Sequence, residues 1–372
     1  METWLIVAVA VLLLAIIGGW FVVTMRPAAR SKTAEAEVDE SGLPRAAVIV
    51  NPSKFTDVEQ VRQTVTAQCR AQGWAGPLWL ETTVDDPGAG QARQALEAEV
   101  EVVCALGGDG TVRVVASELV GTGVPLGLLP GGTGNLLARN LDLPIDSLTA
   151  AVAIALAGQN RSIDVGKVRY EALDDEGRPV SPRSSVEEYF LVMAGLGFDA
   201  SMIADAPEKL KAQIGYGAYI VSGLRHLYGA RFRVHTWVDG GGARRRKARS
   251  VLFANVGGLQ AGITLMPAAA DDGRLDAMIL SPRSLLGWAA VAVHVLSRHR
   301  RGSARVERVR FERMRLRLAE PQQMQLDGDA VGLARSVDVS VVPGALVVRT
   351  GLPADDTAVA VGADPALVTA PR

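Results

Sequence analysis

The residues of this chain that could do chemistry gather in two glycine-rich turns. The first turn, Gly107–Thr111, reads Gly-Gly-Asp-Gly-Thr and follows the apolar run Val102–Leu106. The second, Pro130–Asn135, reads Pro-Gly-Gly-Thr-Gly-Asn and follows the apolar run Pro125–Leu129. Each run is typical of a buried strand, and each turn stands where a helix would begin. Because glycine has no Cβ atom, the backbone N–H groups of both turns can approach a ligand closely.

Backbone N–H groups at a helix N-terminus form an anion site suited to phosphate, and two such turns predict one polyphosphate held between them. The alternative is a pair of ordinary tight turns in an α/β protein. The spacing matches neither the P-loop, which ends in Gly-Lys-Ser/Thr, nor the Gly-x-Gly-x-x-Gly fingerprint of dinucleotide-binding domains. The candidate phosphate-binding residues are Gly107, Gly108, Asp109, Gly110, Thr111, Gly131, Gly132, Thr133 and Asn135.

The two turns together resemble those of the diacylglycerol kinase catalytic domain family, which includes bacterial lipid kinases and sphingosine and ceramide kinases. The first turn alone is shared with NAD kinases and phosphofructokinases; the second, with Ala138-Arg139-Asn140 behind it, narrows the resemblance to the lipid kinases. Gly195–Ala200 and Asp271–Asp276 extend it, so that it covers roughly Arg45 to Arg349. The resemblance implies transfer of the γ-phosphate of ATP to a lipid hydroxyl, with Mg²⁺ as cofactor.

The elements that must position the turns are alternating strands and helices. Strands are expected at Ala46–Val50 and Leu78–Thr82, and helices behind the cap Asp57 and at Gln91–Val100. This alternation predicts a mostly parallel sheet, whose ligand lies beyond the carboxyl ends of the strands. The residues at those ends are Asn51, Thr82, Thr83, Asp109 and Thr133.

The resemblance implies nucleotide contacts from the Asn-Pro turn, through Asn51 and Ser53, and from Thr82 or Thr83. A plain turn at Asn51-Pro52 is the alternative.

Beyond the helix expected at Asp146–Ala157 the pattern changes to short strands separated by turns, which predicts an antiparallel β domain. The expected strands are Ile163–Tyr170, Tyr189–Ala194, Phe232–Val238, Val251–Val256, Leu275–Leu280, Arg315–Leu318, Val337–Val341 and Leu346–Arg349, with helices at Ser201–Lys211, Tyr216–Leu227 and Ser284–Arg298. The predicted fold class is an α/β nucleotide-binding domain (residues 45–160), similar to NAD kinase and diacylglycerol kinase, followed by a β-sandwich-like lipid-acceptor domain (residues 161–350).

Phosphoryl transfer needs positioning, charge neutralisation and a carboxylate that accepts the hydroxyl proton. Asp109 could hold Mg²⁺ or orient the hydroxyl, or simply cap a helix. The resemblance places Asp164 near the acceptor hydroxyl. It also implies a Mg²⁺ site made of the Asp272 side chain and the carbonyls of Ala269 and Arg274. The alternative for the Asp271–Gly273 sequence is a plain hairpin turn.

The chain departs from the family pattern at two positions. Asp329 stands where the family has a glutamate that is proposed as general base, and its side chain is one methylene shorter. Arg113 stands where the family often has asparagine. Arginine there could pair with a phosphate or be solvated.

The apolar stretch Leu5–Val23 is long enough for one transmembrane helix, with Trp4 and Trp20 at its ends. Glu2 precedes it and cations follow it at Arg26 and beyond, so an anchor is favoured over a cleaved signal peptide. The positive-inside rule then predicts a single-pass cell-membrane protein whose catalytic body is cytoplasmic. Residues 1–26 are the expected anchor, 27–44 a flexible linker and 351–372 a disordered tail.

The net charge of −1 over 372 residues argues against a general nucleic-acid binder. Two cysteines and four histidines show no disulfide framework and no metal-ligand spacing. The clusters Arg244–Arg249 and Arg298–Arg301 suit either an anionic membrane leaflet or plain solvation. The acceptor lipid and the oligomeric state are left open. A catalytically weak membrane-tethered nucleotide or lipid sensor, a sphingoid or ceramide kinase and an NAD kinase are the alternatives to a diacylglycerol kinase.

Overall fold

The computed structural model describes residues 42–174, 176–180, 185–197, 231–258, 264–282, 284, 287–288, 291 and 306–351. The expected anchor, nearly all of the expected linker and the expected tail lie outside these ranges, as do the helices expected at Ser201–Lys211 and Tyr216–Leu227 and most of the helix expected at Ser284–Arg298. Within the described ranges, no helix is both long and apolar enough to span a membrane.

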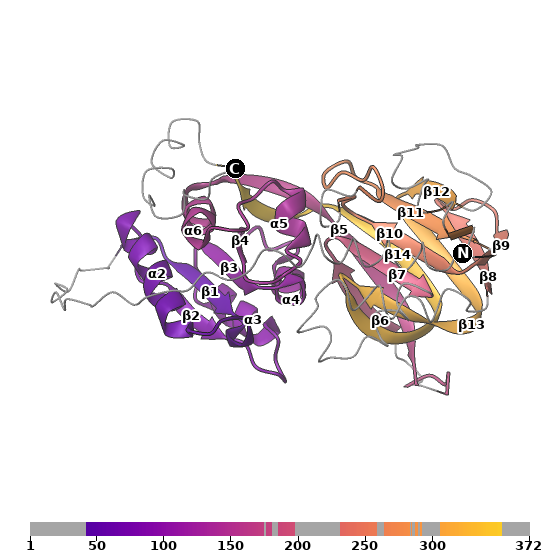
Figure 1. Ribbon diagram of the computed structural model, residues 1–372, viewed down its shortest axis with the longest axis horizontal. Helices are drawn as coiled ribbons and strands as arrows, with labels where there is room; N and C mark the ends of the chain where they lie inside the picture. The colour runs from indigo at the N-terminus through magenta and orange to yellow at the C-terminus, as the bar shows by residue number, and fades with distance from the viewer. Residues whose placement is uncertain are drawn as a thin grey trace, which may run out of the picture. The chain divides into compact units, whose positions relative to one another are not determined.

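The first part of the chain folds as the predicted parallel sheet, with strand order β4-β3-β1-β2 (Figure 1). Its strands are β1 (Ala46–Val50), β2 (Leu78–Glu81), β3 (Val102–Gly107) and β4 (Leu126–Pro130). Its helices are η1 (Pro52–Lys54, 3-10), α2 (Val58–Ala71), α3 (Ala89–Glu97), α4 (Asp109–Leu119), α5 (Leu136–Asn140) and α6 (Leu148–Ala157). Asp57 caps α2 as expected, because its side chain accepts from the Gln60 N–H.

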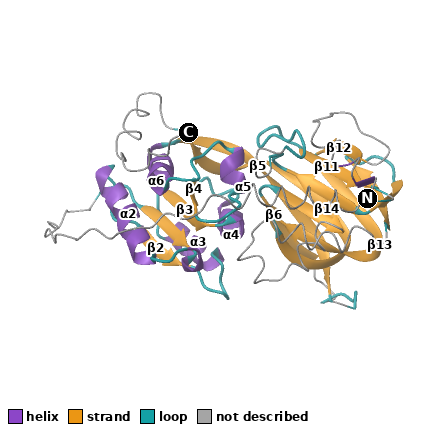
Figure 2. Cartoon of the chain, viewed as in Figure 1, coloured by secondary structure: helices purple, strands orange, loops and turns teal. Residues whose placement is uncertain are grey.

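The parallel strands are buried on both faces, as the crossover helices require. On one face the even-numbered residues of β1, such as Val48, pack with Val65 of α2 and Ala155 of α6. On the other face Ile49 packs with Ala92 of α3 and with Val115 of α4. Figure 2 shows the helices around these strands. The continuous apolar runs of β1 and β3 follow from this two-sided burial.

The second part is the expected β-sandwich, and an apolar core lies between its layers. Its strands are β5 (Gln159–Leu173), β6 (Ser185–Phe190), β7 (Met193–Gly197), β8 (Phe232–Val238), β9 (Arg244–Ala248), β10 (Ser250–Ala254), β11 (Leu275–Leu280), β12 (Val306–Phe311), β13 (Arg313–Leu326) and β14 (Asp329–Thr350). One layer has the order β12-β11-β10-β7, and the other β9-β8-β13-β14-β5-β6. The long strand β13 joins the layers, because its first half pairs with β8 and its last residues with β7.

Several predicted strands were wrong in extent. The strand expected at Tyr189–Ala194 is two strands, β6 and β7, with a break at Leu191 and Val192. The strands expected at Val337–Val341 and Leu346–Arg349 are one strand, β14, with a register shift between Val342 and Leu346. Strands β9 and β12 were not predicted.

Strand β14 ties the two parts together. It pairs along most of its length with β5 and β13, and near its end Val348 pairs in parallel with Leu126 of β4. Strand β14, the last strand in the described part of the chain, therefore extends the first sheet. The domain boundary at 160/161 stays a prediction; β5 begins at Gln159 and crosses it.

Candidate active site

The two glycine-rich turns lie against each other at the carboxyl ends of β3 and β4. The Gly131 N–H donates to the Gly107 carbonyl at 2.9 Å. The turns approach so closely that a Cβ atom on Gly132 would lie 2.6 Å from the Gly108 Cα atom. Only glycine fits at such a contact, because the atom that a side chain would meet belongs to the backbone. The sequence predicted both turns, and the structure brings them together.

Asp109 connects the first turn to the helix behind the second. Its Oδ1 atom accepts from the Leu136 N–H, the first residue of α5, at 2.6 Å. Burial raises the pKa of Asp109 above its ordinary value, although the N–H groups of Leu136 and Asn135 act to lower it, and the negative charge of Asp329 raises it further. The capping role and a role at a ligand are compatible, because that hydrogen bond uses one of two carboxylate oxygens.

The Asn-Pro turn reaches the same place. Asn51 accepts from the Ser53 N–H and hydroxyl through Oδ1, at 3.1 and 2.7 Å, and its Nδ2 lies 3.4 Å from Thr111 Oγ1. The Thr111 side chain is buried, so that contact fixes the start of α4 against η1. Lys54, at the end of η1, extends toward the first turn: a Cβ on Gly108 would lie 3.9 Å from its Cε atom. Lys54 is a cation that the sequence reasoning missed.

Thr82 and Thr83 follow β2 and differ in role. Thr82 is buried, and its N–H donates to the Val50 carbonyl at 2.9 Å. The Thr83 hydroxyl accepts from the Asp86 N–H at 3.0 Å and so closes its own loop. Asp86 accepts from the N–H groups of Gly88 and Gly90. Nucleotide contact by either threonine stays a prediction.

Asn135 holds the second turn in shape. Its backbone is left-handed, with φ 48°, and its side chain both accepts from the Gly132 N–H and donates to the Gly132 carbonyl. Thr133 is exposed at the tip of the turn. Asn140, at the end of α5, bonds the carbonyl and the N–H of Gly258. That contact joins α5 to the loop after β10.

Asp329 reaches the first turn from the β domain. A Cβ atom on Gly110 would lie 3.0 Å from Asp329 Oδ2, and the same oxygen accepts from Arg113 at 3.1 Å. Arg113 also donates to Glu188 of β6 at 3.2 Å. Burial lowers the pKa of Arg113, but the hydrogen bond to Asp329 and the neighbouring carboxylates outweigh it and raise that pKa. Asp329 and Arg113, the two residues at which the chain departs from the family pattern, therefore form an ion pair with each other.

Asp327, two residues before Asp329, is buried and binds the backbone between β6 and β7. Its carboxylate accepts from the N–H groups of Leu191, Val192 and Met193, at 2.8 to 2.9 Å, where β6 breaks and β7 begins. Burial raises its pKa to about 6, although the three N–H groups oppose the shift. The sequence showed Asp327 only as part of a turn. Its three partners lie more than a hundred positions away, which no local pattern reveals.

Asp164 lies in the β domain beside the loop that contains Asp272, and its hydrogen bonds are not with the glycine-rich turns. It is buried, and its two oxygens accept from the Gly273 N–H at 2.7 Å and from the Gly344 N–H at 2.8 Å. Its own N–H donates to the Ala270 carbonyl. Asp164 therefore organises the loop that contains Asp272. Its expected position beside the acceptor hydroxyl stays a prediction.

Asp272 lies in that loop between two arginines. Its Oδ1 accepts from the Arg274 N–H at 3.1 Å, and its Oδ2 forms an ion pair with the Arg310 guanidinium. Within the described ranges, no three His, Cys, Asp or Glu side chains come together as a metal site. The expected site needs only Asp272 with the carbonyls of Ala269 and Arg274, so it stays a prediction.

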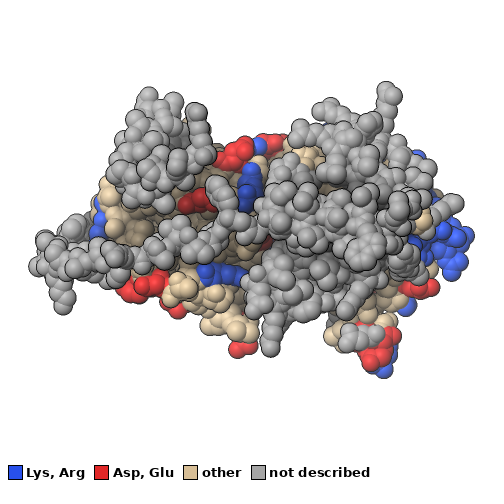
Figure 3. Space-filling view, viewed as in Figure 1, with Lys and Arg blue, Asp and Glu red and all other residues tan. Residues whose placement is uncertain are grey.

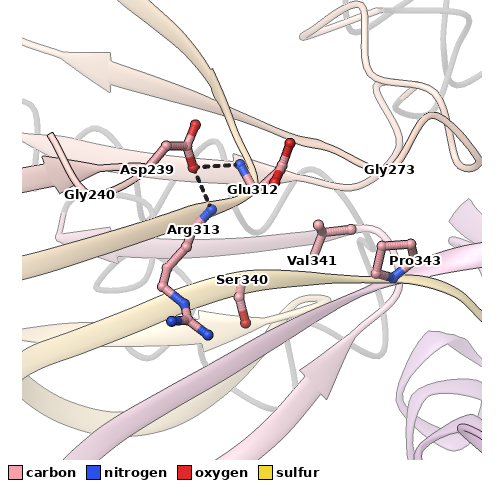
Figure 4. Close-up of a pocket in the computed structure, with 8 residues that line it drawn as sticks. All are labelled: Asp239, Gly240, Gly273, Glu312, Arg313, Ser340, Val341 and Pro343. Carbon is pink, nitrogen blue, oxygen red and sulfur yellow. Dashed lines mark hydrogen bonds between the residues drawn. The ribbon is translucent and has the colours of Figure 1, made fainter.

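A pocket of about 510 Å³ lies beside this loop (Figure 4). Figure 4 shows Asp239 accepting from the backbone N–H groups of Glu312 and Arg313, at 2.9 and 2.8 Å, which closes the turn after β8 onto the β12–β13 turn. The pocket is lined by Asp239, Gly240, Gly273, Glu312, Arg313, Ser340, Val341 and Pro343. Its walls belong to the β domain and do not include the glycine-rich turns.

Comparison with known proteins assigns this chain to a family. Residues 45–168 match the model of the diacylglycerol kinase catalytic domain, and residues 191–350 match that of the YegS C-terminal NAD kinase beta sandwich-like domain. The chain belongs to the family of diacylglycerol kinases and YegS-like lipid kinases. The resemblance inferred from the two turns is confirmed.

Two relatives and one solved structure illustrate the similarity. The chain is 32% identical over 325 residues to the "Probable lipid kinase YegS-like" of Pseudomonas aeruginosa, covering 82% of this chain and 94% of that one. It is 27% identical over 298 residues to the "Diacylglycerol kinase" of Bacillus subtilis, covering 78% and 91%. A crystal structure of a diacylglycerol kinase from Bacillus anthracis superposes with a TM-score of 0.60 at 19% identity, covering 84% and 98%. That last similarity concerns the fold alone.

Proposed function

We propose that this protein transfers the γ-phosphate of ATP to the hydroxyl group of a lipid, with diacylglycerol as acceptor and phosphatidic acid as product. The observation that carries the proposal is the direct packing of the two glycine-rich turns, joined by the Gly131–Gly107 hydrogen bond and by Asp109. Two N–H-rich turns held side by side support a single polyphosphate chain between them. Lys54 adds a cation beside the first turn, where the phosphates would lie.

Among the carboxylates near the turns, we assign the role of proton acceptor to Asp329. Asp329 is half exposed, with 52% of its side chain accessible, and it stands over Gly110, so it can accept the proton of an incoming hydroxyl. That hydroxyl oxygen then forms the new bond to the γ-phosphorus, while the bond from phosphorus to the departing ADP oxygen breaks.

The residues present fit a nucleotide-bound Mg²⁺ at the turns. The Asp109 carboxylate lies at the turns, with its second oxygen outside the hydrogen bond to the Leu136 N–H, and hard carboxylate oxygens are the ligands that Mg²⁺ prefers. The ion would neutralise phosphate charge there. At the second expected site, the Asp272 loop offers the same type of oxygen donors, although the Arg310 guanidinium now pairs with one carboxylate oxygen.

Diacylglycerol is proposed as acceptor because the Bacillus subtilis relative, which this chain matches along 91% of that protein's length, is named diacylglycerol kinase. A sphingoid base or ceramide presents a similar hydroxyl at a polar surface and is the nearest alternative. We also propose that residues 1–26 anchor the chain in the cell membrane with the catalytic body in the cytoplasm, where ATP is available.

The test is phosphate transfer from γ-labelled ATP with magnesium, using the full chain, to a panel of lipids in mixed micelles and, in a separate reaction, to NAD. Asp109→Asn keeps a side-chain oxygen for the Leu136 N–H but removes the charge. We expect labelled phosphatidic acid from the wild type and a loss of about a hundredfold or more in the variant. Label on a sphingoid base or ceramide instead would change the acceptor, and label on NAD alone would refute the lipid kinase.

One observation favours a second function, a nucleotide or lipid sensor with weak catalysis. The Arg113 guanidinium donates to Asp329 Oδ2, so one of the two oxygens that could accept the hydroxyl proton is already engaged in an ion pair. The same assay separates the two functions. ATP binding by calorimetry without labelled product from any lipid would support the sensor.

A further inference from the structure

The outward side of the sheet β9-β8-β13 is covered with cations. Side chains alternate between the two sides of each strand, and the inward residues Val234, Met314 and Leu316 are buried in the sandwich core. The charged residues on the outward side are exposed. We define the cationic face as the outward side chains of these three strands that carry positive charge: Arg233, Arg245, Lys247, Arg313, Arg315 and Arg317.

Strand register places these residues next to one another. Arg233 is paired with Lys247, and His235 lies between Arg245 on one side and Arg317 on the other. Neighbouring strands are about 4.8 Å apart, so the cations form a closely spaced array. Figure 3 shows a blue cluster at the end of the molecule where Figure 1 labels β8 and β9.

This array is not explained by fold stability. Like charges directly opposite each other on antiparallel strands destabilise the pairing. Arg315 pairs with Asp338 of β14, whereas the other five cations of the face form no ion pair with any residue that the structure describes. Charge on an edge strand such as β9 can prevent edge-to-edge aggregation, but β8 and β13 are interior strands.

The face therefore has the properties of a docking surface for an anionic partner, and its shape and chemistry suit a bilayer. It is a sheet surface, and Arg313 at its margin also lines the pocket beside the Asp272 loop. Trp237 is half-buried on the same side and lies 6.3 Å, centroid to centroid, from His235. Tryptophan is enriched at the membrane–water interface, and each Lys or Arg near an anionic leaflet strengthens attachment.

We propose that the cationic face docks onto the anionic headgroups of a phospholipid bilayer. The choice of a bilayer over another polyanion rests on the proposed function, because a kinase whose acceptor lies in a membrane must work at its surface. A nucleic acid is the competing partner, and the test includes it.

The experiment uses the full chain reconstituted in nanodiscs of neutral or of anionic phospholipid. The two native cysteines are buried, so a polarity-sensitive dye can be placed on a single new thiol, at His235→Cys within the face or at Ala67→Cys on α2 as a control. We expect a blue shift in anionic nanodiscs at position 235, reversed by high salt, and no shift at position 67.

Matched variants test the charges. Arg233→Gln, Arg245→Gln and Arg317→Gln together remove three charges from the face; Arg62→Gln, Arg70→Gln and Arg93→Gln remove three from α2 and α3. Each basic residue near an anionic surface raises the ratio of docked to undocked protein about fivefold. Removing the three charges of the first set should therefore lower that ratio by about a hundredfold. The second set should change it by less than about threefold.

Three results would overturn the inference: an equal shift in neutral nanodiscs, a shift that survives the first set, or an equal loss from the second. Displacement from anionic nanodiscs by a single-stranded oligonucleotide at matched charge would reassign the face to nucleic acid. The readout needs no turnover. If the chain docks but transfers no phosphate, the docking inference stands and the proposed kinase activity is refuted. If it transfers phosphate but does not dock through this face, the kinase activity stands and the docking inference is refuted.

Discussion

The Arg113 guanidinium and the Asp329 carboxylate, 216 positions apart in the chain, lie 3.1 Å apart in the folded protein. Arg113 belongs to α4, the helix behind the first glycine-rich turn, and Asp329 is the first residue of β14. The pair therefore fixes the proposed proton acceptor with respect to the proposed phosphate site. Glu188 completes the arrangement, since it accepts from Arg113 and from the Tyr170 hydroxyl.

Removing the Arg113 charge should destabilise the fold. Arg113 is nearly buried, with 11% of its side chain accessible, and Arg113→Gln would leave Glu188 and Asp329 without their cation. We expect a loss of about 1 to 3 kcal/mol in the free energy of unfolding, measured by urea denaturation. The control is Arg93→Gln, which breaks an exposed pair with Glu118 and should cost less than about 1 kcal/mol. Equal effects of the two changes would contradict a structural role for the Arg113 pair.

The contact between the glycine-rich turns predicts the effect of a single methyl group. In Gly132→Ala the new Cβ would lie 2.6 Å from the Gly108 backbone, so the turns must separate. We expect a loss of about 1 to 3 kcal/mol in stability and at least a tenfold weaker binding of a non-hydrolysable ATP analogue in calorimetry. Gly242→Ala meets no atom within 4 Å and serves as control. Unchanged nucleotide affinity in Gly132→Ala would argue against a phosphate site between the turns.

The Asp272 loop can be tested without catalysis. If it holds a divalent cation, magnesium added without nucleotide at about a hundredfold excess over its Kd should raise the melting temperature of the wild type by roughly 3 to 5 °C. Asp272→Asn should abolish that rise, whereas Asp271→Asn, whose carboxylate pairs with Arg161, should keep it. The same rise in all three proteins would place the cation elsewhere.

The buried Asp327 predicts an unusual pH dependence. Its pKa is raised to about 6 in the folded protein, so between pH 4 and 6 the folded state binds more protons than the unfolded state. The stability that this group contributes is therefore largest at low pH and falls as the pH rises toward 6, by about 2 to 3 kcal/mol in total. Urea denaturation at several pH values should show that the stability of the wild type relative to Asp327→Asn decreases over this interval. A difference that stays constant, or that grows with pH, would contradict the shift.

The sequence predicted the elements whose pattern is local. The runs in β1, β3 and β4 are buried on both faces, and each ends in residues that only a turn accommodates, so both the strands and the phosphate turns could be recognised. The charged strand β9 was not predicted, because an Arg-rich run carries no apolar alternation. The strand is defined by its pairing with β8, and the residue between the outward cations Arg245 and Lys247 is another arginine, Arg246.

Contacts between distant segments explain most of what the sequence did not reveal. Pro343 and Gly344 look like a turn between two strands, yet β14 continues through them, and the Gly344 N–H is used by Asp164. Likewise, at the break between β6 and β7 the N–H groups of Leu191 and Val192 donate to the Asp327 carboxylate. For both Asp164 and Asp327, the residues next to the aspartate in the sequence give no sign of which distant N–H groups it binds. Side chains that bind backbone groups across the fold leave no spacing pattern in the chain.

The pairing of β14 with β4 also has a consequence for biosynthesis. The strand that completes the nucleotide-binding sheet is made long after its partner, since Val348 pairs with Leu126. The parallel sheet must therefore wait, with the β4 edge unpaired, until β14 has left the ribosome. An unpaired edge is a site for wrong association, so the nascent nucleotide-binding sheet depends on a strand from the second part of the chain to close it.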